Sequence, residues 1–242
     1  MEASAQPPAV PQIIAHRGVR RQAVRENTIA AFEVALSAGA QMIETDVRRS
    51  GDGQLAILHD QALDGATLSD CSLDEFERRT GFRPPLLTEV LAWANGRIAL
   101  DIELKEDGYA QEVVPLLREF AAAGNGLITT SFLDQLLNSL AKIAPELELG
   151  LLVEDSAGDA VKRATQAGAR IVLPEMKLVD DALISHVTEA GLKLIVWDFM
   201  AADHSWLLAD PRLTAVITDD VPGALSALRA RATDVAVREA HH

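Results

Sequence analysis

Short runs of apolar residues alternate along the chain with amphipathic segments. Each run is almost continuously apolar, which is typical of strands buried on both faces of a sheet. The amphipathic segments follow a helical period: Leu133, Leu136, Leu137 and Leu140 are three and four apart, and Pro145 follows as a stop signal. The pattern predicts eight strands, at Gln12–Ala15, Met42–Val47, Ile98–Leu104, Gly126–Thr130, Leu147–Val153, Arg170–Leu173, Lys193–Trp197 and Thr214–Thr218.

Eight strand–helix units without a linker in 242 residues predict an α/β protein with a (β/α)8 TIM-barrel fold. The alternative is a doubly wound sheet, which uses fewer strands and a glycine-rich phosphate loop. The chain contains no G-x-G-x-x-G motif, so the barrel is favoured.

One polar stretch, residues 61–85, interrupts this alternation. We expect it to be a small insertion after the second strand, with a short helix over Ser72–Arg79. Residues 12–230 are then a single barrel domain. We expect residues 1–11 to be a disordered N-terminal arm and residues 231–242 to be a C-terminal tail.

The net charge of the chain argues against two classes of binding partner. Thirty-six acidic and 22 basic residues give a net charge of −14, which argues against nucleic acid or an anionic membrane as the main partner. No run of 18 apolar residues is present, so we expect no transmembrane helix and no stable membrane insertion. Cys71 is the one cysteine, which excludes an intrachain disulfide, and without a signal-like N-terminus we expect a cytoplasmic protein. The oligomeric state stays open.

Acidic residues stand near the ends of the second and third predicted strands, at the end of a barrel where active sites lie. Glu44 and Asp46 are two apart and so face one side of their strand. Asp101 and Glu103 have the same spacing, and Lys105 shares their phase. Carboxylates inside a barrel need a counter-charge to stay ionised. Oxygen ligands favour a hard cation, Mg²⁺ or Ca²⁺, over zinc.

Two histidines lie at the ends of extended segments. His16 ends the first apolar run, and His59 follows Leu55–Leu58. A single histidine is more often structural, but two of them near inward carboxylates favour an acid–base pair, since an unperturbed pKa of ~6.5 suits both roles at neutral pH. Asp219, after the last strand, is interpreted as a cap of the final helix.

The sequence resembles the glycerophosphodiester phosphodiesterase family in five motifs that occur in the same order. The resemblance covers about residues 12–228, and its C-terminal half is weaker, at Thr130-Ser131-Phe132, Val196-Trp197 and residues 217–222. The five motifs are His16-Arg17-Gly18, Glu26-Asn27-Thr28, Glu44-Thr45-Asp46-Val47, Asp52-Gly53 with His59-Asp60, and Ile102-Glu103-Leu104-Lys105.

The resemblance implies a TIM-barrel enzyme that hydrolyses glycerophosphodiesters, small-molecule substrates, to sn-glycerol 3-phosphate and an alcohol. It implies that Glu44, Asp46 and Glu103 hold a divalent metal, Mg²⁺ or Ca²⁺. It implies that His16 and His59 are the general acid–base pair; we expect His16 to be the base, and the reverse assignment stays open. It implies that Arg17 and Lys105 contact the phosphate. We also expect Trp197 to contact the substrate and Asn27 to position the substrate or a metal-bound water.

The sequence departs from the family pattern at three places: Arg25 replaces a proline, Gln61–Gly65 differs, and Asp198-Phe199-Met200 follows Trp197. These places are where the glycerol or the alcohol would be held, so they affect the identity of the substrate more than the class of reaction. We therefore keep two alternatives with the same site. One is a lysophospholipase D or sphingomyelinase D-like enzyme acting on lipids. The other is a barrel that binds phosphodiesters without cleaving them. Metal-dependent enolate chemistry is a further option, but it leaves the two histidines without a role.

Overall fold

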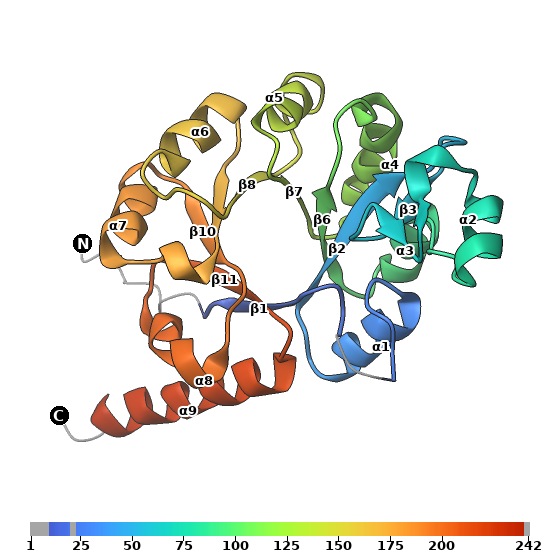
Figure 1. Cartoon of the computed structure of the whole chain (residues 1–242). Helices are drawn as coiled ribbons and strands as arrows, with labels where there is room; N and C mark the ends of the chain where they lie inside the picture. Colours follow the sequence, from blue (N-terminus) through green and yellow to red (C-terminus); the bar gives the residue numbers. More distant parts are fainter. Residues whose placement is uncertain (1–9, 20–22, 240–242) are drawn as a thin grey trace.

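The chain folds into a closed barrel of eight parallel strands with helices around it (Figure 1). This computed structural model describes residues 10–19 and 23–239, with side chains as far as Arg231. The strands are, in their order around the barrel, β1 (Gln12–Ala15), β2 (Met42–Arg49), β6 (Ala99–Leu104), β7 (Leu127–Ser131), β8 (Leu149–Val153), β9 (Ile171–Pro174), β10 (Lys193–Val196) and β11 (Leu213–Thr218). β11 pairs with β1 and closes the ring. The predicted TIM-barrel fold and its eight strands are confirmed.

The helices pack on the outside of the barrel. The side chain of Thr28 caps α1 by accepting a hydrogen bond from the backbone N–H of Ala31 at 3.2 Å. The periodic leucines that predicted a helix before Pro145 lie in α5, with Leu136, Leu137 and Leu140 fully buried. The helices are α1 (Ile29–Ser37), α3 (Leu87–Ala94), α4 (Ala110–Ala122), α5 (Asp134–Ile143), α6 (Ala160–Ala167), α7 (Asp181–Glu189), α8 (Ala201–His204) and α9 (Val221–Glu239).

The insertion after the second strand lies between β2 and α3. It begins with β3 (Leu55–Ile57), which pairs antiparallel with β2, so it starts before residue 61. A small hairpin, β4 (Ala62–Leu63) and β5 (Ala66–Thr67), and the helix α2 (Leu73–Thr80) follow. Its apolar side chains form a separate cluster that includes Leu58, Leu68 and Phe76. In Figure 1 this unit lies at the outer side of β2.

Only some of the predicted domain limits fall within the residues that the structure describes. The N-terminal arm lies outside them, except for Val10 and Pro11. α9 continues past residue 230 to Glu239, so the expected start of the tail falls inside a helix. In the described part of the chain no helix is long and apolar enough to cross a membrane. The cytoplasmic location stays a prediction.

The side chains of β2 that face the inside of the barrel change from apolar to acidic along the strand. On β2, Met42 belongs to the apolar cluster inside the barrel, and Glu44 and Asp46 follow in the same phase. Ile43 and Val47, in the opposite phase, belong to the main core that also includes the helices. On β2 the interior is therefore apolar at the amino end and acidic at the carboxyl end, whereas Leu152 and Ile217 stay apolar near the carboxyl ends of β8 and β11. The apolar cluster inside the barrel is Ile14, Met42, Ile128, Leu152, Ile171, Leu173, Ile195, Ala215 and Ile217.

Gly18 fixes the loop that leaves β1. Its φ is +80°, and a Cβ atom there would lie 2.8 Å from the carbonyl carbon of Ala31 and 2.9 Å from Cδ1 of Phe32. The loop therefore packs directly on α1, which only glycine allows. This close approach holds His16 and Arg17, the two preceding residues, at the mouth of the barrel.

We predict that Gly18→Ala lowers the free energy of unfolding by about 3 kcal/mol. About 1–2 kcal/mol comes from the left-handed backbone and the rest from the contact with α1. Gly65→Ala is the matched control, because Gly65 has a φ of +78° but open space around it. Urea unfolding of both variants checks the prediction, and equal losses in the two would contradict it.

Candidate active site

A cavity of about 440 Å³ opens at the carboxyl ends of the barrel strands. Seven of the nine residues predicted for the site line it: His16, Arg17, Glu44, His59, Glu103, Lys105 and Trp197. The other two, Asp46 and Asn27, are buried and do not line the cavity themselves. Oδ1 of Asp46 lies 3.3 Å from Nζ of the lining residue Lys105, and Oδ2 of Asp46 accepts a hydrogen bond from the amide of Asn27 at 2.7 Å. The structure thus brings the whole predicted set together. The remaining lining residues are Asp101, Thr130, Phe132, Leu152, Glu154, Asp198 and Ile217.

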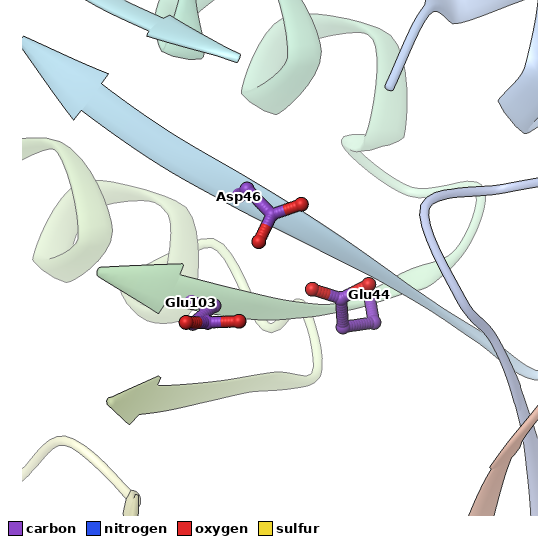
Figure 2. A group of neighbouring side chains, drawn as sticks. All are labelled: Glu44, Asp46 and Glu103. Carbon is purple, nitrogen blue, oxygen red and sulfur yellow. The ribbon is translucent and has the colours of Figure 1, made fainter. Parts of the chain in front are cut away.

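Three buried carboxylates meet at one side of this cavity (Figure 2). Glu44 and Asp46 come from β2 and Glu103 from the adjacent β6, where Asp46 and Glu103 are direct neighbours in register. One oxygen from each lies within 4.8 Å of the others. All three side chains are less than a tenth exposed. The strand period of two, combined with the parallel register, produces this cluster.

Two cations partly compensate the carboxylates. Nζ of Lys105 lies 2.7 Å from Oε1 of Glu103 and 3.3 Å from Oδ1 of Asp46. Nε of Arg17 lies 3.4 Å from Oδ2 of Asp46, and its guanidinium also pairs with Glu26 at 2.9 Å. Burial lowers the pKa of both cations, but the neighbouring carboxylates, Asp46 first among them, together outweigh it, so both pKa values are raised and both groups stay charged.

Asn27 holds Asp46 in place. Its amide donates to Oδ2 of Asp46 at 2.7 Å and its oxygen accepts from the hydroxyl of Thr45 at 2.7 Å. Asn27 has a φ of +56°, in the left-handed region that asparagine tolerates better than most residues. The sequence-based prediction gave Asn27 a substrate contact, whereas here its side-chain bonds go to Asp46 and Thr45.

The pKa values of the carboxylates are shifted by their burial and by their neighbouring charges. Burial, and then the charges of Asp46 and Glu103, raise the pKa of Glu44 well above its usual value. Burial and the charge of Asp46 raise the pKa of Glu103 to about 8. Burial acts in the same direction on Asp46, but Lys105 and Arg17 lower its pKa overall. A purely oxygen donor set with too little counter-charge fits a hard divalent cation, so these three residues could hold a metal ion.

Both histidines are oriented by an aspartate. Nδ1 of His16 lies 2.8 Å from Oδ1 of Asp219, and Nδ1 of His59 lies 2.8 Å from Oδ1 of Asp60. An aspartate at Nδ1 favours the tautomer with its proton there and leaves Nε2 free to accept a proton. Nε2 of His16 lies 4.0 Å from Oε2 of Glu44. Two ring nitrogens are therefore available for proton transfer at the edge of the carboxylate cluster.

The interpretation of Asp219 as a helix cap is wrong. The first turn of α9 is capped by its neighbour Asp220, which accepts from the backbone N–H of Gly223 at 3.1 Å. Asp219 instead follows β11, which closes the barrel against β1 and so brings it beside His16. Closure of the predicted barrel could have indicated this contact, because residues that follow two paired strands become neighbours.

A second contact that the sequence reasoning missed holds the backbone of His59. Nε of Arg48, on β2, donates to the His59 carbonyl at 2.7 Å, and its guanidinium also bonds Glu106 at 2.7 Å. The insertion is thereby tied to the barrel at the residue next to the cavity.

Asp101 is a fourth buried carboxylate. It accepts a hydrogen bond from the hydroxyl of Thr130 at 2.8 Å, and its Oδ2 has no hydrogen-bond partner among the described residues. Burial raises its pKa to about 7.

A barrel whose carboxyl end combines a carboxylate cluster with two oriented histidines, an arginine and a lysine has the groups of a phosphodiester hydrolase. The comparison with known families agrees. The model of the "Glycerophosphoryl diester phosphodiesterase family" matches residues 16–222, and the chain belongs to this family of hydrolases.

Individual relatives support the assignment. The chain is 28% identical over 229 residues to the glycerophosphodiester phosphodiesterase of Caldanaerobacter subterraneus. The matched region covers 86% of this chain and 93% of the relative. A phosphodiesterase from Oleispira antarctica, solved in complex with the product sn-glycerol-3-phosphate, superposes with a TM-score of 0.80 at 25% identity over 91% of this chain and 97% of that one. A glycerophosphodiester phosphodiesterase from Agrobacterium tumefaciens gives 0.75 at 26% identity over 89% and 99%.

We predict that Asp101→Asn becomes more stable relative to the wild type as the pH rises. The folded pKa of Asp101 is about 7, against 3.8 for the free group, so between these values the folded state holds a proton that the unfolded state has lost. Asp101 therefore costs the wild type stability as the pH rises through this window, by about 1.4 kcal/mol per unit.

Urea unfolding of both metal-free proteins between pH 5 and pH 7 measures this difference, which should grow by about 2–3 kcal/mol. The control is Asp155→Asn, a change at an exposed carboxylate outside the cavity. A constant difference between Asp101→Asn and the wild type would contradict the assignment.

Proposed function

We propose that the protein is a divalent-metal-dependent phosphodiesterase that hydrolyses glycerophosphodiesters to sn-glycerol 3-phosphate and an alcohol. The observation that carries the proposal is the buried carboxylate cluster beside Lys105, Arg17 and two aspartate-held histidines in one cavity. Membership of the family supports it, as does the product bound to the Oleispira antarctica relative.

Glu44, Asp46 and Glu103 would hold the metal, Mg²⁺ or Ca²⁺. When bound, a divalent cation supplies positive charge that stabilises the phosphoryl oxygens as negative charge develops on them. The raised pKa values of Glu44 and Glu103 support this choice, because a cation at the cluster would favour the ionised form of both.

Arg17 and Lys105 bind the phosphate in this proposal. Both lie on the cavity surface, both are mostly buried, and both remain charged. Charged donors in a partly desolvated site interact strongly with phosphoryl oxygens. Their ion pairs with Asp46 fix their position before the substrate arrives, which lowers the cost of ordering them.

His16 and His59 transfer the protons. In the first step Nε2 of His16 takes the proton of the glycerol hydroxyl that bonds the phosphorus, and His59 gives a proton to the oxygen of the leaving alcohol, so that a cyclic phosphate remains. Water then opens the cyclic phosphate: His59 takes a proton from the water and His16 returns its proton to the glycerol oxygen, which gives glycerol 3-phosphate and restores both histidines. Asp219 and Asp60 keep the two rings oriented through Nδ1.

We predict that His16→Ala and His59→Ala each lower kcat for glycerophosphocholine by about 10²–10⁴-fold, since each removes a proton-transfer group. Unfolding temperatures should stay close to that of the wild type. His186→Ala, an exposed position on α7 away from the cavity, is the control. Product release is followed as glycerol 3-phosphate and free choline.

Retained activity in either cavity variant would remove that histidine from the mechanism. A parallel assay with lysophospholipids separates the lipid alternative, which predicts faster hydrolysis of the acylated substrates. Calorimetric binding of the diester without product would favour the binding-only alternative.

We predict that Mg²⁺ or Ca²⁺ stabilises the wild type against unfolding. A ligand at 100 times its Kd adds about 2.7 kcal/mol. Glu103→Gln removes one of the three carboxylates and should lose most of this gain. Glu112→Gln, a change at an exposed acid on α4, should keep it. Thermal unfolding with each metal measures the effect, and an equal gain in Glu103→Gln would argue against the cluster as the metal site.

A further inference from the structure

Arg48 follows the carboxylates in the inward-facing series of β2. Glu44, Asp46 and Arg48 are two apart along the strand and so face the same side. The side chain of Arg48 is 13% exposed, but in contrast to Arg17 and Lys105 it does not line the cavity. The place of Arg48 therefore points to a role through the residues that it bonds.

Arg48 bridges two residues that come from different parts of the chain. Its Nε donates to the carbonyl of His59 at 2.7 Å, and its Nη1 donates to Oε1 of Glu106 at 2.7 Å. Glu106 directly follows Lys105, and its Oε2 also accepts from the backbone N–H of Arg49 at 3.3 Å. The two donors belong to one planar guanidinium with fixed directions, so Arg48 sets the position of His59 relative to Glu106.

The barrel side of this bridge is fixed independently of Arg48. The backbone N–H of Lys105 donates to the carbonyl of Val47 at 3.2 Å, and the hydroxyl of Tyr109 donates to the same carbonyl at 2.9 Å. Tyr109 is fully buried, so water does not compete for this bond. Loss of the Arg48 side chain would therefore leave Lys105 and the end of β6 in place.

His59 has fewer bonds to the barrel than the end of β6 has. The residue before it, Leu58, donates its backbone N–H to the carbonyl of Asp46 at 3.0 Å and so continues the pairing of β3 with β2. In the part of the chain that the structure describes, the bond from Arg48 is the hydrogen bond that joins His59 itself to a barrel strand. Asp60, at Nδ1 of His59, is its neighbour in the chain with a side chain 77% exposed, so it does not tie the ring to the barrel.

We propose that Arg48, held by Glu106, is a positioning residue that sets the His59 ring for proton transfer. The proposal rests on the proposed phosphodiesterase function, in which His59 protonates the leaving alcohol. A general acid must lie within hydrogen-bond reach of the oxygen that it protonates, and a displacement of about 1 Å can cost about 100-fold in rate. The apolar cluster of the insertion is separate from the main core, so the polar contact through Arg48 supplies this alignment.

The test compares two diesters whose leaving groups differ in their need for an acid. The alkoxide that leaves glycerophosphocholine must be protonated, whereas the nitrophenolate that leaves the 4-nitrophenyl ester of glycerol 3-phosphate is stable without a proton. Alcohol release is measured in a single turnover with saturating enzyme and Mg²⁺ or Ca²⁺, so neither substrate binding nor opening of the cyclic phosphate limits the signal. We expect Arg48→Ala to lower this rate about tenfold for glycerophosphocholine and less than about twofold for the nitrophenyl ester.

Two further variants connect this effect to the bridge and to the histidine. Glu106→Gln keeps the size of the side chain but weakens its pairing with Arg48, so it should shift the ratio of the two rates in the same direction by about threefold. His59→Ala should shift the ratio further than Arg48→Ala does. An unchanged ratio in His59→Ala would overturn the proposal, because His59 would then not be the acid.

Arg49→Ala is the matched control, because it removes the next arginine of β2, whose ion pair with Glu112 at 3.1 Å lies at the surface. It should leave the ratio unchanged. The ratio does not depend on the folded fraction of a preparation, since unfolded protein cleaves neither substrate. Equal losses on both substrates in Arg48→Ala and Glu106→Gln, or no loss on either, overturn the positioning role and leave the phosphodiesterase function standing. If the wild type hydrolyses neither diester, the proposed function fails and the positioning role fails with it.

Discussion

The surplus of negative charge inside the barrel is the constraint on which the rest of the site depends. Glu44, Asp46, Asp101 and Glu103 are all buried at the carboxyl ends of two adjacent strands. Burying ionised carboxylates costs several kcal/mol each unless they are paired. Burial first, and then the charges of neighbouring carboxylates, raise the pKa values of Glu44, Asp101 and Glu103, and Arg17 and Lys105 do not offset this. The barrel therefore holds a destabilising arrangement that the proposed divalent cation would relieve.

Several residues outside the carboxylate cluster hold its side chains and their neighbours in position. The tight contact of Gly18 with α1 carries Arg17 over the carboxylates. Asn27, in a left-handed conformation, fixes Asp46. The pairing of β11 with β1 brings Asp219 to His16. The apolar layer from Met42 to Ile195, deeper in the barrel, supplies the packing against which the acidic layer is held.

The barrel and the carboxylate cluster could be predicted because both depend on short-range periodicity. Apolar runs buried on both faces show the strands, and a spacing of two puts Glu44 and Asp46 on one side. Asp219 was misinterpreted because its partner lies 203 positions away and becomes a neighbour only when the barrel closes. The extended segment at Leu55–Leu58 could also be predicted from the sequence, but its antiparallel pairing with β2 could not, because the pairing depends on the turn between them. The substrate contact of Asn27 stays a prediction, and its bonds to Asp46 and Thr45 could not be predicted, because a motif shows a residue but not the atoms that it bonds.

The insertion has a packing core of its own, built from side chains such as Leu68 and Phe76 and separate from the main core. His59 lies where this unit meets the barrel, joined to it through Arg48, whereas His16 follows a barrel strand. Units with separate cores can open with different free energies. The two histidines proposed to transfer protons therefore belong to parts of the molecule with separate packing cores. Opening of the smaller unit alone would displace His59 and leave His16 in place.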